Sequence, residues 1–232
     1  MVTSRLGSDG HQSTGIGGKG LRYNIEVANP AVDWRGNCNL PQEFVVGRVL
    51  AKAASGSEYW TEVGWAKHSC LGGQTGPCPY SYDQPQGTWF LFCNSFDLTL
   101  GAKYAFRVRH VNGPGQNGIW GQMYYNGVWH TLETNGNMKC QLADGSGNCY
   151  FEIYLEVFSD DLTPHPDLFA DNDGVAGNQF NTGQFLSLAG AWNSWNQGTI
   201  AASAGAVTPY DYCNWTKWHS FSIKKSANCT LP

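Results

Sequence analysis

The sequence is short of the features that mark several large protein classes. Charged residues make up only 14% of its 232 residues, no basic run is present, and the net charge is −4. Nucleic-acid-binding domains usually gather Lys and Arg on one face, so we expect no nucleic-acid partner. No apolar stretch approaches the roughly 20 residues that a membrane-spanning helix needs, so we also expect no membrane span.

Several catalytic and metal-binding motifs are missing too. The cysteines include no CxxC pair, the six histidines show no HExxH spacing, and no GxSxG occurs. These absences argue against a zinc site, a metalloprotease and a serine hydrolase, and we expect no cofactor. The exception is "DNDG", where Asp171 and Asp173 offer calcium-type oxygen ligands beside a glycine turn. The rest of an EF-hand is absent, and a simple Asx turn is the alternative.

Helical periodicity is likewise absent, whereas short alternating runs bounded by Gly, Asn, Asp and Pro are frequent. This pattern is typical of an all-β sandwich. Asn126–Gly127 suits a type I′ hairpin turn between two aromatic-rich strands. We expect a flexible N-terminal arm at 1–20, then one β-sandwich domain at 21–232 with a loop-rich segment near 160–205. Strands are expected at 21–28, 43–53, 58–66, 88–93, 103–111, 119–125, 127–132 and 149–158, and a last one within 210–225.

Eight cysteines are present, an even number, scattered through expected loops and strand ends. Together with the absence of metal spacing, this predicts four disulfides and an oxidising, extracellular location. Sequence does not fix the connectivity. Two pairs are locally plausible, Cys70–Cys78 and Cys140–Cys149. Cys213–Cys229 would fasten the C-terminal segment, which would leave Cys38–Cys93.

The most informative segment is "CYFEIYLEVFSDD" at 149–161. Side chains alternate faces along a strand, so the apolar residues from Phe151 to Val157 share one face and Glu152, Tyr154 and Glu156 share the other. In "EYWTEVGWAKH" the same alternation places Trp60 and Glu62 together, with Gly64 two residues further on. Glycine in a strand often permits close approach by a ligand or another backbone. Exposed glutamates are usually only solvated side chains, so this pattern is not sufficient by itself.

Two carboxylates on one sheet face suit acid–base chemistry. If the two strands belong to one sheet, Glu62 and Glu156 would face the same region. Facing carboxylates repel when both are ionised, so one of them tends to stay protonated. The ionised carboxylate can then act as a general base on water, while the protonated one stabilises an oxyanion.

Two short motifs resemble the glutamic-peptidase superfamily, the eqolisins and neprosins. "TEVGW" is similar to the strand that carries the first catalytic residue, with Glu62 in that place, and "EIYLE" is similar to the strand that ends in the catalytic glutamate, here Glu156. The resemblance spans about residues 43–160. It implies a secreted, concanavalin-like jelly-roll and acid-pH peptide hydrolysis without a cofactor. Glu156 would be the general base and protonated Glu62 would polarise the scissile carbonyl.

Further residues are expected around such a site. Trp60 and Tyr154 would line the substrate-binding region, and Glu152 would also contact substrate. Arg107 shares a strand face with Arg109. These two are either a surface charge pair or, for Arg107, a site position that tunes a glutamate or binds a substrate carboxylate.

Two other functions remain open. A non-catalytic glycan-binding or surface-structural jelly-roll module fits the aromatic, Asn- and Gly-rich surface. A retaining β-glucanase would place Glu–x–Asp–x–Glu on one strand, and "EIYLE" has that spacing with Tyr154 in place of the Asp. Trp192 and Trp195 would stack on a glycan or pack in the core.

Overall fold

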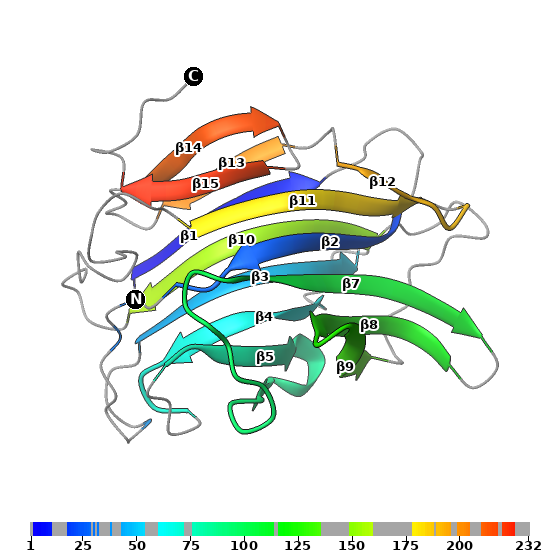
Figure 1. Cartoon of the computed structure of the whole chain (residues 1–232), viewed down its shortest axis with the longest axis horizontal. Coiled ribbons are helices and arrows are strands. Elements are labelled where there is room, and N and C mark those ends of the chain that lie inside the picture. The colour runs from blue at the N-terminus through cyan, green and yellow to red at the C-terminus, as the bar shows by residue number, and fades with distance from the viewer. Residues whose placement is uncertain are drawn as a thin grey trace.

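The structure of this chain is a computed structural model. The described residues are 2–10, 18–28, 30, 32, 38, 43–53, 60–71, 76–113, 116–135, 149–159, 178–187, 189–195, 199–204, 210–217 and 220–225. They form two antiparallel sheets that pack face to face, which confirms the predicted all-β sandwich (Figure 1). Within these ranges, no helix has the length and apolar character needed to cross a bilayer.

The first sheet, sheet A, has the strand order β13-β1-β10-β3-β4-β5-β6. The pairings β13-β1, β1-β10 and β10-β3 join strands that lie far apart in sequence, whereas β3, β4, β5 and β6 pair in chain order. The strands are β1 (Val2–Gly10), β3 (Glu43–Ala53), β4 (Trp60–His68), β5 (Cys78–Asp83), β6 (Thr88–Leu91), β10 (Cys149–Ser159) and β13 (Thr199–Ala204).

The second sheet, sheet B, has the order β14-β15-β11-β2-β7-β8-β9, and β12 pairs with β11 off this path. A single 3₁₀ turn, Gln84–Gln86, joins β5 to β6. The strands are β2 (Gly18–Glu26), β7 (Lys103–Gly113), β8 (Gln116–Tyr125), β9 (Val128–Asn135), β11 (Asn178–Ser187), β12 (Trp192–Ser194), β14 (Tyr210–Lys217) and β15 (Ser220–Lys225).

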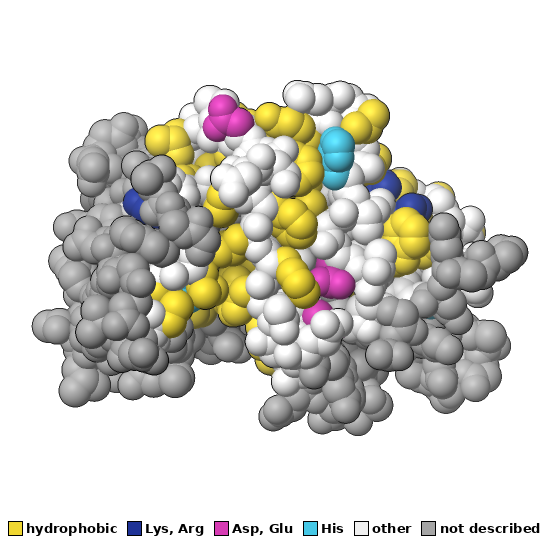
Figure 2. Space-filling model, turned by 90° about the horizontal axis from the view of Figure 1, so that it is seen from below, with side chains coloured by type: hydrophobic (Ala, Val, Ile, Leu, Met, Phe, Trp, Pro, Cys, Tyr) yellow, Lys and Arg dark blue, Asp and Glu magenta, His cyan; other side chains and the backbone are white. Residues whose placement is uncertain are grey.

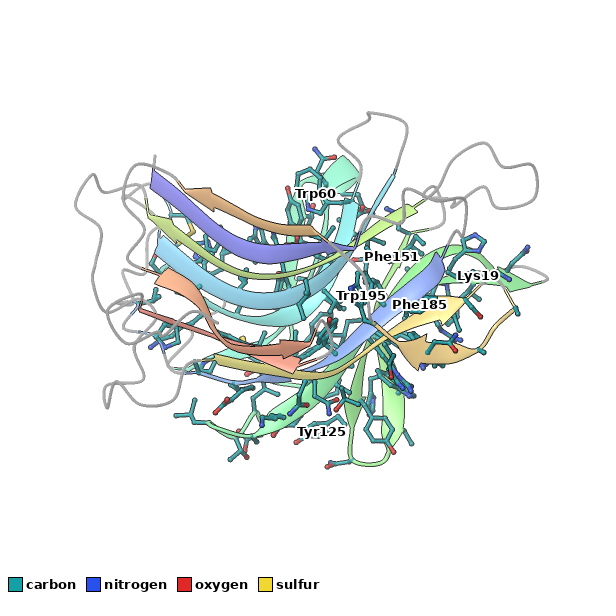
Figure 3. All side chains as sticks on the ribbon, turned by 90° about the horizontal axis from the view of Figure 1, so that it is seen from above. Lys19, Trp60, Tyr125, Phe151, Phe185 and Trp195 are labelled. Atoms are coloured by element: carbon teal, nitrogen blue, oxygen red, sulfur yellow. A yellow bond between two sulfur atoms is a disulfide. The ribbon has the colours of Figure 1, made fainter. Side chains whose placement is uncertain are left out.

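The main core lies between the sheets. Sheet A contributes Val63 and Trp65 from β4, and sheet B contributes Phe106 from β7 and Met123 from β8, all completely buried. The Trp65 indole N–H donates to the Glu26 carbonyl oxygen over 2.8 Å, so its polar atom is satisfied inside the core. Figure 3 shows Phe151, Phe185 and Trp195 near the middle of the molecule, where the two layers meet.

Several predicted strands are confirmed closely. β3 spans the predicted 43–53, and β10 extends the prediction by one residue. The hairpin turn also forms as expected, because Asn126 and Gly127 both have positive φ, at 49° and 85°. The strand predicted at 58–66 is shifted, since β4 runs from Trp60 to His68.

Other segments differ from the expectation. The arm expected at 1–20 contains β1, which pairs with β10 on one side and β13 on the other, and the start of β2. The glycine and serine residues of this segment have low strand propensity. β1 forms nevertheless, because its backbone is paired with a strand on each side. The segment expected to be loop-rich near 160–205 contains β11, β12 and β13. Asp171 and Asp173 lie outside the described residues.

The disulfide pairing corrects two predictions. Cys38 is bonded to Cys70, and Cys78 to Cys93, with Cα atoms 5.2 and 4.9 Å apart. The predicted pairs Cys70–Cys78 and Cys38–Cys93 are therefore wrong. Cys78 begins β5 and Cys93 follows β6, so pairing of these adjacent strands brings the two together. The other two predicted pairs each include a cysteine outside the described residues, Cys140 or Cys229.

Candidate functional site

The candidate site is the face of sheet A that points away from sheet B, which we call the outer face of sheet A. Along β4, Thr61, Val63 and Trp65 point to the sandwich interior, so Glu62 and Ala66 lie on the outer face. Along β10, Phe151 and Ile153 are part of the core. The intervening positions of β10, which hold all its glutamates, therefore belong to the outer face.

Strand register fixes where the three glutamates of this face stand. Leu50 of β3 pairs with Glu152 on one side and with Glu62 on the other, so these two glutamates share a row across the sheet. Glu156 pairs with Val46 and lies four positions further along β10. From usual strand spacings, the backbone of Glu62 is roughly 10 Å from that of Glu152 and roughly 16 Å from that of Glu156. The predicted pair thus shares one face of one sheet, and Glu152 is the nearer of the two to Glu62.

Glu62 is a buried, ion-paired carboxylate. Its exposed fraction is 1%, and its Oε2 lies 2.5 Å from Nη1 of Arg48. The Tyr80 hydroxyl donates to its Oε1 over 3.1 Å. Burying an unpaired carboxylate is costly, and the guanidinium offsets much of that cost while favouring the ionised form of Glu62.

Arg48 occupies the row between Glu62 and Glu156. It pairs with Tyr154 of β10 and with Gly64 of β4, and Gly64 in turn pairs with Tyr80 of β5. Arg48 is not among the residues predicted for the site, because it lies in the apolar run "EFVVGRVLAKA". The useful signal there was a single arginine among apolar residues, with Val46 and Leu50 as its neighbours on the same face of the strand.

Aromatic side chains surround this ion pair. Trp89 contacts Tyr80 with ring centroids 5.0 Å apart and Tyr82 at 5.4 Å, and Tyr82 also contacts Trp60 at 6.1 Å. Trp60, Tyr82 and Trp89 are only partly buried. Figure 3 shows Trp60 on the opposite side of the molecule from Tyr125 of sheet B. Burial raises the pKa of the Tyr82 hydroxyl, and the nearby Glu62 carboxylate raises it further.

His68 closes one end of the aromatic cluster. Its ring stacks on Phe44 at 5.5 Å and meets the edge of Trp89 at 5.8 Å. The backbone N–H of Cys70 donates to Nδ1 of His68 over 3.2 Å, which requires that nitrogen to be unprotonated. Burial lowers the pKa of His68 from 6.5 to about 4. The imidazole is therefore neutral over most of the mildly acidic range.

Gly64 of the "TEVGW" motif has a structural explanation. A Cβ atom on Gly64 would collide with the carbonyl oxygen of Gly47 and lie 2.8 Å from the Arg48 Cα, so the close approach is made by the β3 backbone. We expect Gly64→Ala to lower the free energy of unfolding by about 1–3 kcal/mol, as overpacking usually does. Chemical denaturation measures this. Gly76→Ala is the matched control, because a Cβ there meets nothing within 4 Å. Equal stabilities of the two variants would contradict the steric account.

The remaining predicted residues divide between the sheets. Arg107 does not join the glutamates, because its neighbours Phe106 and Val108 face the core from sheet B, which places Arg107 on the outer face of that sheet. Its expected role beside a glutamate is therefore corrected. Trp195 is 95% buried in the core, whereas Trp192 is partly exposed on β12.

The arrangement on sheet A supplies the elements of carboxylate chemistry. It combines a buried guanidinium, a tyrosine hydroxyl and three glutamate positions on one face, with aromatic rings beside them. Such a set can activate water, stabilise negative charge and hold an extended substrate. Compared with known proteins, the chain matches no family model and no curated protein.

Proposed function

We propose that this protein is a secreted endopeptidase that hydrolyses peptide bonds at acid pH with glutamates on the outer face of sheet A. The observation that carries the proposal is the buried Glu62–Arg48 ion pair on the same sheet face as Glu152 and Glu156. Buried ionic groups are expensive, and they concentrate at functional sites. The Cys38–Cys70 and Cys78–Cys93 disulfides support a secretory location.

In this proposal Glu156 is the general base. It takes a proton from water as the water oxygen attacks the scissile carbonyl carbon. It then returns a proton to the leaving nitrogen as the C–N bond breaks. Glutamate side chains ordinarily ionise near pH 4.3, and a general base works best near its own pKa, so an acid optimum follows.

The ion pair gives Glu62 a different role from the one expected from sequence. A carboxylate held by a guanidinium favours its ionised form, so Glu62 is a poor proton donor to an oxyanion. We assign that stabilising role to the positive charge of Arg48, whose row lies between Glu62 and Glu156. Glu62 is then a positioning residue that orients Arg48.

The test is cleavage of a denatured protein between pH 2 and 8. The number of new amino termini released measures the cleavage. We expect cleavage by the wild type in the acid range. Glu156→Gln should lower it at least about 100-fold, the usual contribution of a general base. Full activity of Glu156→Gln would exclude this assignment, and absence of cleavage by the wild type at every pH would exclude the peptidase.

A second candidate function, glycan binding on the same face, is favoured by the partly exposed rings of Trp60, Tyr82 and Trp89. Sugars stack on such rings without any need for Glu156. Binding of a neutral glycan by a protein that cleaves no peptide, and by its Glu156→Gln variant equally, would favour this function. A β-glucanase would instead release reducing sugar and depend on Glu152.

A further inference from the structure

The outer face of sheet B bears an arginine cluster that the proposed peptidase does not use. Register places Gln184, Arg22, Arg107, Gln122 and Thr131 in one row across β11, β2, β7, β8 and β9. Arg109 lies on the same face two residues beyond Arg107 on β7. We call Arg22, Arg107 and Arg109 the arginine cluster.

Glutamine side chains hold these arginines in fixed orientations. The Arg22 Nε donates to Gln184 Oε1 over 2.6 Å. Gln122 Oε1 accepts from Nε of both Arg107 and Arg109, at 2.8 and 3.0 Å, and its amide nitrogen donates to Thr131 at 3.0 Å. Every one of these arginine contacts uses Nε. The terminal edge of each guanidinium, which binds carboxylates with two parallel N–H groups, is left for another partner.

Two tryptophans fix the planes of the guanidinium groups. Arg107 lies over the Trp129 ring, 3.7 Å from its centroid, and Arg22 lies 4.5 Å from the centroid of Trp192. Stacking of this kind stabilises a cation and reduces its freedom to rotate. The cluster is therefore held in place by side chains of six strands, β2, β7, β8, β9, β11 and β12, and Arg107 is only 8% exposed.

The charge of the cluster has no counterpart within the described residues. Within the part of the chain that the structure describes, none of the three arginines forms an ion pair. Burial lowers the pKa of Arg107 to about 10, with further lowering by Arg109 and Arg22. The group still carries its charge at neutral pH. Like charges held together without an anion are unfavourable, so a bound anion would stabilise this arrangement.

The surroundings of the cluster favour a sugar as the carrier of the anion. Amide and hydroxyl groups of Gln184, Gln122 and Thr131 share its row, and Asn24 and Thr182 lie beside it, bonded to each other over 3.2 Å. Such groups suit sugar hydroxyls, and Tyr124, 42% exposed, offers a ring next to Trp129.

We propose that the arginine cluster binds carboxylate groups of an acidic polysaccharide, such as one built from uronic acids, on the outer face of sheet B. The three guanidiniums would hold the carboxylates, and the amides and rings would contact the sugar. This site lies on the opposite side of the sandwich from the glutamates, and it does not depend on peptide cleavage.

Binding of oligogalacturonate, measured by calorimetry at moderate salt, tests the proposal. The wild type should bind it and should not bind the methyl-esterified oligomer, which is the same sugar without charge. Arg22→Gln and Arg109→Gln should each weaken binding about tenfold or more, because each removes a charge-assisted contact. Arg107→Lys keeps the positive charge but removes the two parallel N–H donors of the guanidinium, and it should also weaken binding several-fold.

Lys103→Gln is the matched control, since it removes one positive charge at the exposed start of β7. It should change binding less than twofold. The proposal would be overturned if the wild type did not bind oligogalacturonate, or if it bound the acid and its methyl ester equally. It would also be overturned if Lys103→Gln and Arg109→Gln lost the same affinity. Binding of heparin but not of oligogalacturonate would overturn the carboxylate assignment in favour of sulfate esters. Arg22 and Arg109 are partly exposed, so unchanged thermal midpoints should confirm that their variants fold.

Discussion

Arg48→Met is expected to lower the free energy of unfolding by about 3–5 kcal/mol, the usual cost of removing one partner of a buried ion pair. Glu62 is 1% exposed and Arg48 is 6% exposed, so water does not replace the lost guanidinium. Methionine fills a similar volume without a charge. The Glu62 carboxylate would then keep the Tyr80 hydroxyl but lose the cation 2.5 Å from its Oε2. Urea denaturation at pH 7 measures the change.

The double variant Arg48→Met/Glu62→Leu separates charge from packing. Replacing both partners with apolar side chains removes the uncompensated charge, and such replacements are often close to neutral. We therefore expect the double variant to recover most of the stability lost by Arg48→Met, with a coupling energy of at least about 2 kcal/mol. Additive losses would show that the pair is not energetically coupled. In the proposed peptidase, the double variant should be stable yet inactive.

His68 is expected to make the protein lose about 3 kcal/mol of stability between pH 6.5 and pH 4. Its pKa is lowered from 6.5 to about 4 in the folded state, so the unfolded chain takes up the proton first as the pH falls. The stability is present above pH 6.5 and is lost as the pH falls toward the folded value. A shift of that size, at about 1.4 kcal/mol per pKa unit, gives the stated magnitude. Protonation also ends the hydrogen bond from Cys70 N–H to Nδ1.

His68→Asn is the appropriate comparison, because it can keep an acceptor for Cys70 N–H and does not titrate in this range. It will lose stacking on Phe44 at every pH, so only the change with pH is informative. Burial raises the pKa of Asp83 and Glu133, which favours folding as the pH falls, but both proteins contain these groups. Parallel stability curves between pH 7 and 4 would contradict a buried neutral His68.

Local periodicity accounts for the parts of the fold that sequence predicted well. In β10 the alternation placed Phe151 and Ile153 in the core and assigned the glutamates to the other face. The Asn126–Gly127 dipeptide was likewise sufficient to predict the hairpin turn at these two residues. Both features depend only on residues that are close together in the chain, so they can be predicted from a single sequence.

The errors arose where distant segments decide the structure. Cys78–Cys93 follows from pairing of β5 with β6, and β5 itself was not recognised in "CPYSYD". Alternation placed Arg107 and Arg109 on one face of a strand, but it did not say which sheet or which side of the sandwich. For the same reason Arg48 was missed, since its ion pair depends on the register between β3 and β4.

Which large hydrophobic side chains are exposed also depends on the order of the strands in the two sheets. Phe90, Leu100, Tyr124 and Val128 are exposed large hydrophobic residues of the described chain. Figure 2 views the molecule from the side where β5 and β9 lie at the bottom of Figure 1, and hydrophobic side chains gather there between polar ones. Sequence marked this region only as aromatic-rich.

The most direct test of the central claim compares Glu156→Gln with Glu152→Gln. The two glutamates lie on one strand and one face, four residues apart, so the substitutions are chemically matched. The measurement is kcat/KM at the acid optimum on one peptide that the wild type cleaves. The account predicts a loss of at least about 100-fold for Glu156→Gln and less than about tenfold for Glu152→Gln. The reverse order would contradict the assignment of Glu156 as the general base, and equal wild-type rates in both variants would contradict a glutamate mechanism on this face.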